Sequence, residues 1–334
     1  MSKKTANLDA PIIELNERIK KLQDNSKEED ILSETKKLEE QKVSLLKKIY
    51  SNLSPYDIIQ ISRHHLRPPV SDYIRFMVDD FIELHGDRCF GDDKAIITGI
   101  GKFGNKRAMI IGHQKGKTTK ERIIYNFGMP NPEGYRKALH KMRLAEKFHL
   151  PVVTLIDTPG ANPDIGAEER GQAHAIAANI AEMSRLRTPI ICIVIGEGGS
   201  GGALGIGVGD RFLILEYAYC SVISPEGCAA ILWKSKDNAE EAANALKLTA
   251  KDLFEMGIVD EVIPEPLGAA HNSPKEMANT LKETIMRYLD ELQEIPMDLL
   301  IENRYNKYRK IGRFQNGDIL KEPVNIKKTK ESIS

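Results

Sequence analysis

The sequence contains few cysteines, and they are not arranged as metal ligands. There are four in 334 residues, Cys89, Cys192, Cys220 and Cys228, and no two of them form a Cys-x-x-Cys pair. Structural zinc sites use closely spaced cysteine or histidine ligands, so the spacing excludes a zinc ribbon within this chain. Cys192 and Cys220 lie in apolar runs, and we expect them to be reduced core residues.

Long apolar runs and an excess of charge of one sign are also missing. No stretch approaches the roughly 20 apolar residues of a membrane-spanning helix, and the first residues lead into charged sequence rather than the apolar core of a signal peptide. The 48 basic residues balance the 48 acidic ones, so no net field favours nucleic acid or an anionic membrane. We therefore expect a cytoplasmic protein, or a stromal one if a plastid transit peptide has been removed.

Glycine, in contrast, is concentrated in one segment. Residues 190–195 form an apolar run typical of a buried strand, and five glycines follow within the seven residues from Gly196 to Gly202. Ala203 and Leu204 then restart a helical pattern. Backbone N–H groups at a glycine turn before a helix can bind an anion. The segment therefore predicts a phosphate-binding loop or an oxyanion hole, unless it is only a tight turn without a ligand.

Two nucleotide-binding interpretations fit parts of the sequence. Gly196, Gly198 and Gly201 match the dinucleotide fingerprint, but the only room for a crossover helix, residues 203–211, holds three more glycines, each costing up to about 1 kcal/mol in a helix. Residues 155–160 resemble a GTPase turn. Residues 112–118 resemble a P-loop, but with three residues between the glycines where four are needed. Binding of NAD or GTP therefore stays an alternative.

Alternating strand and helix patterns from residue 95 onward predict an α/β domain. The expected strands are 95–98, 108–111, 152–156, 190–195, 212–215 and 220–223. The expected helices are 79–85, 134–148, 168–186, 238–258 and 274–293, with another starting at residues 224–226 (SPE). Residues 11–50 predict a helical arm, broken near residues 24–26, that is either solvated or packed on a partner subunit. Residues 315–334 are polar and basic, and we expect them to be disordered.

A series of motifs then gives a specific resemblance. They lie at residues 113–117 (HQKGK), 126–130 (NFGMP), 132–137 (PEGYRK), 157–161 (DTPGA), 166–172 (GAEERGQ), 196–202 (GEGGSGG), 224–228 (SPEGC), 231–235 (ILWKS) and 263–268 (IPEPLG). In these motifs, from about residue 11 to about residue 312 and in one register, the sequence resembles the alpha-subunit family of the bacterial and plastid acetyl-coenzyme A carboxylase carboxyltransferase.

The resemblance implies a fold and a division into domains. The implied fold is α/β and crotonase-like (ClpP/crotonase), a superhelix of ββα units with an N-terminal helical arm. We expect the arm at residues 1–50, the CoA carboxyltransferase domain at 51–298, a C-terminal helical extension at 299–314 and a disordered polar tail at 315–334.

The resemblance also implies an activity and partners. The activity is transfer of a carboxyl group from carboxybiotin, on the biotin carboxyl carrier protein, to acetyl-CoA, which gives malonyl-CoA for fatty acid biosynthesis. A beta subunit of related fold would complete an α2β2 assembly and carry the zinc ribbon, so no metal is expected in this chain. ATP would be used by the separate biotin carboxylase. A non-catalytic crotonase-like scaffold stays a further alternative.

Site residues follow from the resemblance position by position. Gly201 and Gly202 would form the oxyanion hole for the biotin ureido oxygen, because the pair follows the loop serine in the family. The cleft and biotin-binding positions would be Gly198, Gly199, Ser200, Thr158, Pro159 and Gly160. A basic run, Lys115, Lys117, Lys120 and Arg122, would contact CoA phosphates or the partner unless it is a solvated face.

Three further positions carry narrower expectations. His113 and His174 are interpreted as structural rather than catalytic, because the released biotin nitrogen can itself take the proton from the acetyl methyl group. Asn162 stands where the family often has an aromatic residue. If that ring packs on biotin, this chain lacks the contact.

Overall fold

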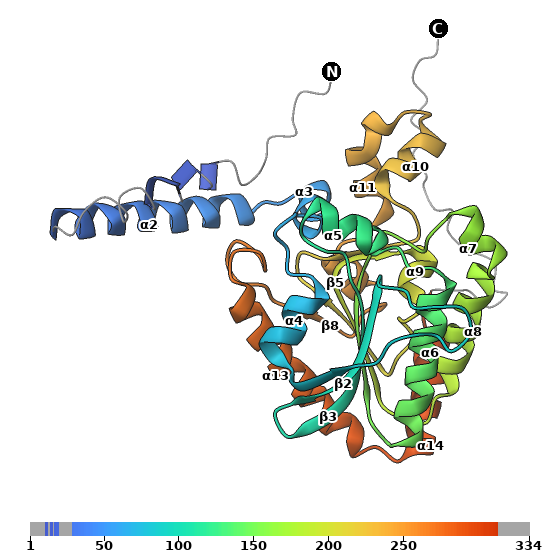
Figure 1. Ribbon diagram of the computed structural model, residues 1–334. Helices are drawn as coiled ribbons and strands as arrows, with labels where there is room; N and C mark the ends of the chain where they lie inside the picture. The colour runs from blue at the N-terminus through green and yellow to red at the C-terminus, as the bar shows by residue number, and fades with distance from the viewer. Residues whose placement is uncertain (1–10, 13, 16, 20–28, 313–334) are drawn as a thin grey trace, which may run out of the picture.

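The computed structural model describes residues 11–12, 14–15, 17–19 and 29–312. A central sheet forms the body, and one long helix projects from it (Figure 1). The arm break predicted near residues 24–26 and the tail predicted at 315–334 lie outside the described residues. Within the described ranges, no helix is both long and apolar enough to cross a bilayer.

The sheet has eight strands within the described residues, in the order β1-β2-β3-β4-β5-β6-β8, with β7 paired to β5. Their bounds are β1 Asp79–Glu83, β2 Ile96–Phe103, β3 Lys106–His113, β4 Val152–Thr158, β5 Ile190–Gly199, β6 Arg211–Leu215, β7 Tyr219–Ser221 and β8 Glu261–Ile263. The pairs β1–β2 and β2–β3 are antiparallel, and all the others are parallel.

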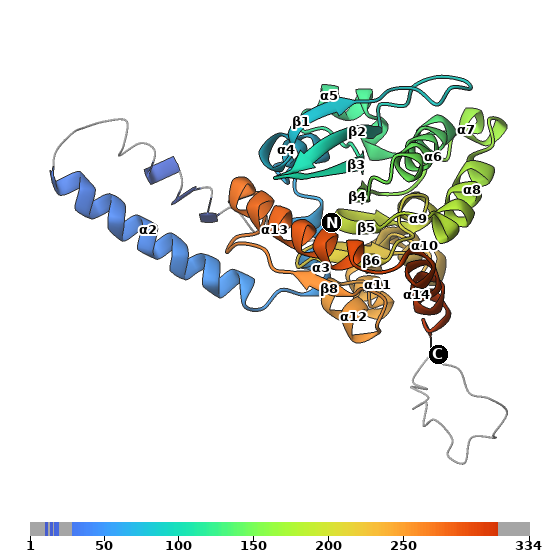
Figure 2. The same ribbon diagram turned by 90° about the horizontal axis from the view of Figure 1, so that it is seen from below.

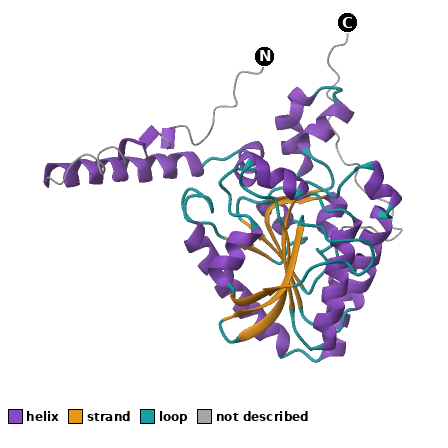
Figure 3. Ribbon diagram, viewed as in Figure 1, coloured by secondary structure: helices purple, strands orange, loops and turns teal. Residues whose placement is uncertain are grey.

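Helices cover both faces of the sheet (Figures 1 and 3). Helix α4 packs on α13 on one side, and α6, α8 and α14 pack together on the other. The helices are α2 Glu29–Tyr50, α3 Pro55–Ser62, α4 Val70–Met77, α5 Thr119–Ile124, α6 Pro132–Lys147, α7 Ile165–Glu169, α8 Gln172–Arg185, α9 Ser200–Leu204, α10 Pro225–Leu232, α11 Ala239–Leu246, α12 Ala250–Glu255, α13 Pro274–Gln293 and α14 Met297–Arg309, with the 3₁₀ turns η1 Asn126–Gly128 and η2 Lys236–Asn238.

The core lies around β4 and β5. Every residue of these two strands is buried. This explains their high Val and Ile content, since helices cover a parallel sheet on both faces. The strands predicted at 152–156 and 190–195 are confirmed, as is the helix at 274–293. The helix start at Ser224 is confirmed too, because the Ser224 side chain accepts the Gly227 N–H at 3.0 Å and Pro225 follows as the first helical residue.

The helix predicted at residues 79–85 is wrong. Residues Asp79–Glu83 form β1 and pair with β2. The reason lies in β2, where an added Cβ at Gly99 would come 2.4 Å from the Phe81 ring and one at Gly101 would come 2.3 Å from Val78. The two glycines leave room for these side chains across the strand pair, a fit that the local pattern of 79–85 does not show.

Two predicted helices are divided. The segment 238–258 contains the last residue of η2 and all of α11 and α12. The two helices are separated because Lys247 adopts a left-handed conformation and Thr249 forms a bridge to Tyr219 before capping α12. The segment 168–186 contains the end of α7 and all of α8, separated at Gly171, whose φ is +84°. Both breaks are backbone reversals that helical periodicity alone does not predict.

The strand that carries the glycine segment is longer than predicted. β5 continues beyond Ile195 to Gly199, and its last three residues pair with β7. Helix α9 follows at once and has five residues, so it is not the crossover helix of a dinucleotide-binding unit. The turn from β5 into α9 therefore lies at the carboxyl end of the central strand, next to the loop that leaves β4.

Candidate functional site

The turn between β5 and α9 is pressed against the loop after β4. An added Cβ at Gly199 would lie 2.2 Å from the Pro159 carbonyl oxygen, and one at Gly202 would lie 2.5 Å from the Ala161 nitrogen. Both contacts are with backbone, so glycine is required at these two positions. A Cβ at Gly201 would instead find nothing closer than Ile176 at 3.8 Å. At Gly201, unlike at Gly199 and Gly202, the position of a Cβ does not face the loop after β4.

The loop after β4 is fixed by Thr158. Its buried hydroxyl donates to the Gly160 carbonyl at 2.7 Å and accepts the Gly160 N–H at 3.1 Å. Thr158 is also the β4 residue that pairs with Gly198 in the sheet register. Pro159, between Thr158 and Gly160, is exposed. The cleft residues named from the sequence thus lie together, with Thr158, Gly160 and Gly198 inside the structure and Pro159 at its surface.

Two adjoining pockets open beside this turn. The smaller, about 240 Å³, lies between Pro159, Gly199, Ser200 and the segment 221–224 after β7. The larger, about 350 Å³, is lined by Lys115, Arg122, Phe127 and Glu197. Arg63 and Pro159 line both pockets.

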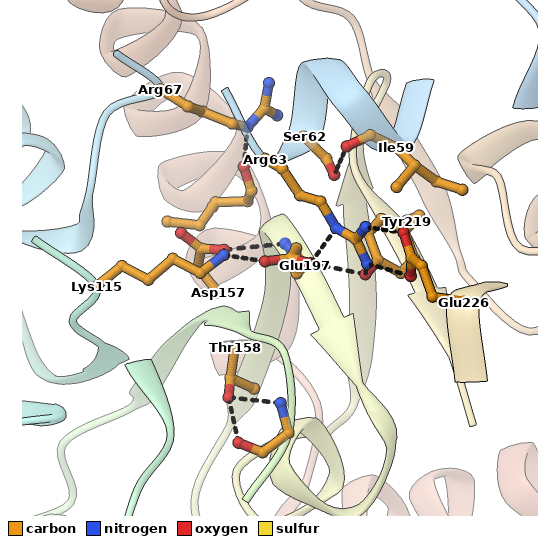
Figure 4. A network of polar contacts seen from close by, with 12 residues as sticks. Ile59, Ser62, Arg63, Arg67, Lys115, Asp157, Thr158, Glu197, Tyr219 and Glu226 are labelled. Carbon is orange, nitrogen blue, oxygen red and sulfur yellow. Dashed lines mark hydrogen bonds and ion pairs between the residues drawn. The ribbon is translucent and has the colours of Figure 1, made fainter. Parts of the chain in front are cut away.

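Beneath the pockets lies a buried network of charges (Figure 4). The Glu197 carboxylate accepts from Arg63 Nε and from the Tyr219 hydroxyl, each at 2.7 Å, and forms an ion pair with Lys115. Lys115 Nζ also donates to Asp157 Oδ1 at 2.8 Å. Asp157 Oδ1 in turn accepts the Glu197 backbone N–H at 2.9 Å. The Glu197 side chain is only 6% exposed, so its charge is balanced almost entirely by the protein.

The pKa values follow from this arrangement. Burial alone would raise the pKa of Glu197, but the nearby Lys115 and Arg63 charges outweigh it and lower that pKa to about 2. Burial likewise opposes the charge of Lys115, yet Asp157 and Glu197 raise its pKa above the usual value. Glu197 and Lys115 therefore both stay charged throughout the physiological pH range.

Arg63 extends the network to a second carboxylate. It donates to Glu226 in the first turn of α10 at 2.7 Å and to the Tyr219 hydroxyl at 2.9 Å. Arg63 is the residue that ends α3. The network therefore ties together α3, the segment after β3, β4, β5, β7 and α10.

The four residues of the basic run, Lys115, Lys117, Lys120 and Arg122, do not lie on one common surface. Lys115 is turned inward and its charge is satisfied by Asp157 and Glu197. Lys117 and Lys120 are exposed, and Lys117 forms an ion pair with Asp72. Arg122 lines the larger pocket, and its Nε makes no hydrogen bond within the described part of the chain.

Asn162 and the two histidines lie away from the pockets' lining. The Asn162 side chain is 7% exposed and donates to Asn131 Oδ1 at 2.8 Å, ahead of α6. Asn162 is thus held inside the fold. His113 is fully buried at the end of β3, and burial together with Lys115 lowers its pKa to about 3, so the ring is neutral. His174 is exposed on α8.

Sequence reasoning did not assign a role to Arg63, Glu197, Tyr219 or Glu226. For Glu197 a signal was present, since a carboxylate inside a buried strand and glycine segment requires a cationic partner. The partners themselves come from segments 22 to 134 residues away, and no local pattern connects them.

Nearly the whole chain resembles known proteins. Residues 5–312 match the family described as acetyl co-enzyme A carboxylase carboxyltransferase-like. A Rhodopirellula baltica protein is 53% identical over 304 residues, covering 91% of this chain and 95% of its own length. One from Geobacter sulfurreducens is 58% identical over 269 residues, covering 80% and 84%. Both are named acetyl-coenzyme A carboxylase carboxyl transferase subunit alpha.

Solved structures share the fold at low sequence identity. A transcarboxylase 12S structure with methylmalonyl-coenzyme A bound matches 69% of this chain and 44% of its own, with a TM-score of 0.53 and 21% identity. The beta subunit of Pseudomonas aeruginosa geranyl-CoA carboxylase matches 73% and 46%, with a TM-score of 0.54 and 15% identity. The chain thus spans less than half the length of these two proteins.

These neighbours are crotonase-fold carboxyltransferases, and they confirm the crotonase-like α/β fold expected from the sequence. The family match spans all of the described residues, including the glycine turn and the loop after β4. This chain belongs to the acetyl-coenzyme A carboxylase carboxyltransferase-like family.

Proposed function

We propose that this chain, together with a beta subunit, transfers the carboxyl group of carboxybiotin to acetyl-CoA and forms malonyl-CoA for fatty acid biosynthesis. One observation carries the proposal. The Rhodopirellula baltica relative, named acetyl-coenzyme A carboxylase carboxyl transferase subunit alpha, is 53% identical and covers 91% of this chain and 95% of its own length. The agreement therefore extends over nearly the whole protein rather than one motif.

Gly201 and Gly202 are proposed as the catalytic positions of this chain. They lie in the first turn of α9, where backbone N–H groups have no partner within the helix. Gly199, which precedes the helix, has no side chain that could cap them. The two N–H groups would donate to the ureido oxygen of carboxybiotin as negative charge develops there. Loss of one such donor typically costs about 2.7–4 kcal/mol of transition-state stabilisation.

The smaller pocket is the proposed place for the biotin ring. Biotin supplies the carboxyl group when the carrier protein delivers it. Gly199, Ser200 and Pro159 line the pocket and would exclude water from one side of the ring. Gly198, Thr158 and Gly160 hold those residues through the sheet pairing and the Thr158 hydroxyl. Asn162 takes no part in this proposal, because its side chain is held inside the fold.

Contacts to CoA phosphates or to the partner are proposed for Lys117, Lys120 and Arg122. Two of these are exposed and the third lines the larger pocket. Cations at such positions can bind phosphate groups. Lys115 is left out of this set, because Asp157 and Glu197 already satisfy its charge.

The assembly and the location are proposed from the family resemblance. A beta subunit would complete an α2β2 enzyme and carry the structural zinc. The carrier protein would deliver biotin after carboxylation by biotin carboxylase. Among the described residues, no group of three or more His, Cys, Asp and Glu side chains could hold a metal ion. We propose the cytoplasm, or the plastid stroma, as the location.

The first experiment is the decarboxylation of malonyl-CoA in the presence of free biocytin. The chain alone, a zinc-ribbon beta subunit alone and the two mixed should be compared, and we expect activity only in the mixture. Gly201→Val places a side chain on the open side of the turn without a backbone clash, so turnover with biocytin should fall by about 10²-fold or more.

Gly91→Val is the matched control. A Cβ added at Gly91, like one at Gly201, would meet no backbone atom, since nothing lies within 4 Å of it. Gly91 lies in the loop before β2. This variant should retain activity within about twofold. An inactive mixture in which the complex nevertheless forms would contradict the catalytic role and favour a scaffold. A fully active Gly201→Val variant would contradict the placement of the reaction at this turn. Binding of NAD or GTP by the isolated chain would favour the nucleotide alternative.

A further inference from the structure

The end of β5 has an unusual composition for a strand that must hold a fixed position. Three of its last four residues are glycines, Gly196, Gly198 and Gly199, and Glu197 is the only one with a side chain beyond Cα. Glycine weakens a strand because it has no side chain to pack and because it loses more backbone conformational entropy on folding than other residues do. The partner strand β7 has only three residues. Packing therefore does little to fix this segment, and Glu197 is the side chain available to do so.

All the interactions of Glu197 serve to hold it in one place. One carboxylate oxygen, Oε1, accepts from Arg63 Nε and the Tyr219 hydroxyl, and the other, Oε2, contacts Lys115 Nζ. These donors come from the end of α3, from β7 and from the segment after β3. Three donors in three directions fix both the position and the orientation of a carboxylate.

The backbone on either side of Glu197 is fixed by the same network. Asp157 Oδ1 accepts the Glu197 N–H, and an added Cβ at Gly196 would lie 2.5 Å from that oxygen. The Asp157 carboxylate therefore sits directly against the strand, in the space that the missing side chain leaves. Lys115 holds Asp157 and Glu197 at once. Gly198 follows, four residues before Gly202.

The stability that the ion pairs contribute is not by itself a reason to keep such a network. Replacing a buried ion pair with apolar residues of similar size is often neutral or stabilising. An arrangement of side chains that supports a site is, in contrast, worth retaining, because a displacement of about 1 Å in a reacting group can cost about 10²-fold in rate.

We infer that Glu197, held by Lys115, Arg63 and Tyr219, is a positioning residue that sets the place of the Gly198–Gly202 turn relative to the reacting groups. This inference rests on the proposed function, because it assigns the turn a part in carboxyl transfer. Glu197 lines the larger pocket, but in this assignment it acts on the reacting groups through the backbone that follows it.

The test compares Glu197→Gln with Asp210→Asn in the complex with the beta subunit. Asp210 is the matched control, since its carboxylate is also buried in an ion pair, with Arg304, but it accepts from the Ile190 N–H at the opposite end of β5. In Glu197→Gln, the new amide NH₂ group cannot accept from Lys115. We expect kcat to fall about 10- to 100-fold while KM for malonyl-CoA changes by less than about threefold.

Amide hydrogen exchange of the peptide containing residues 196–202 gives a second readout that does not depend on turnover. Exchange should become faster in Glu197→Gln and stay unchanged in Asp210→Asn, whose kcat should also stay near that of the parent. Lys115→Met should act like Glu197→Gln, and the double variant should cost less than the product of the two single effects.

Each outcome has one meaning. A lower kcat with unchanged exchange of 196–202, or unchanged kcat with unchanged exchange, would overturn the positioning role. An equal loss of kcat in Asp210→Asn would also overturn it, because the effect would then be one of general stability. Faster exchange with normal kcat would support a positioning role for Glu197 but contradict the proposed function's use of this turn.

Discussion

Glycine is required for different structural reasons at different positions of the segment from Gly196 to Gly202. Gly196 leaves space for the Asp157 carboxylate, and Gly199 and Gly202 leave space for the backbone of the loop after β4. Of the five glycines in the segment, only Gly201 has room for a Cβ, whose nearest neighbour would be the Ile176 side chain at 3.8 Å. The sequence does not distinguish these reasons, because each depends on which distant segment lies against the glycine.

At the same scale, the charge of Glu197 predicts a pH dependence of stability. Its pKa is lowered from 4.5 to about 2 in the folded chain. A carboxylate with a lowered pKa stabilises the fold above its unfolded pKa, and this contribution is lost as the pH falls from about 4.5 to about 2. The contribution at neutral pH is on the order of 3 kcal/mol.

Glu197→Gln should therefore be less stable than the parent at neutral pH, and the difference should shrink as the pH falls below about 4.5. Urea denaturation of both proteins at neutral pH and at about pH 3 would measure this. A stability difference that stays constant across this range would show that the carboxylate charge is not what stabilises the fold there.

At the scale of the elements, the last described helix carries a fully buried cation that helps to fix it. The Arg304 side chain of α14 is fully buried and pairs with Asp210 at 2.7 Å. It also donates to three backbone carbonyls at and just after the C-terminal end of α8, those of Met183, Leu186 and Thr188. The guanidinium group thus joins α14 to the end of α8 and to Asp210, which directly precedes β6, and it satisfies carbonyl groups that α8 leaves without partners. Helices α14 and α8 lie beside each other (Figure 2).

Arg304→Met should destabilise the protein strongly, because it leaves the buried Asp210 carboxylate without its partner. Breaking a buried pair from one side costs about 3–5 kcal/mol. The midpoint of urea denaturation would report the loss, and adding Asp210→Asn should recover part of it. An unchanged midpoint in Arg304→Met would contradict the anchoring role.

At the scale of the whole molecule, helix α2 stands apart from the core (Figures 1 and 2). The main hydrophobic cluster begins at Val70 and includes no residue of α2 among the described ones. The contacts near the end of the helix are few. The Tyr50 ring lies 5.3 Å from that of Tyr217, and Leu46 packs near Gly268. We propose a boundary between an arm at residues 1–50 and the domain that follows it.

A chain that begins at residue 51 should fold with the same α/β core. Its melting temperature should fall by only a few degrees, since each kcal/mol corresponds to about 2–4 °C in a protein of this size class. Circular dichroism melts would test the fold. The mass of the complex with a beta subunit, measured by light scattering, would show whether the arm contributes to assembly. An unfolded product would contradict the boundary.

The sequence by itself determined the elements whose signal is local or repeated over many residues. The apolar runs of β4 and β5, the N-cap of α10 and the spacing of α13 predict these elements correctly, and the family motifs predict the family. Buried parallel strands and capped helices leave a pattern in consecutive residues, because each residue's environment is set by its neighbours in the chain.

Only the tertiary structure decided the rest. Residues 79–83 form a strand paired with β2, where Gly99 leaves room for the Phe81 ring and Gly101 for Val78, the residue just before the strand. Lys115 turned inward, away from the rest of its basic run, because Asp157 and Glu197 lie beneath it. These outcomes depend on charges and close contacts between segments far apart in the chain. Such interactions act through space, so their partners are set by the fold rather than by sequence spacing.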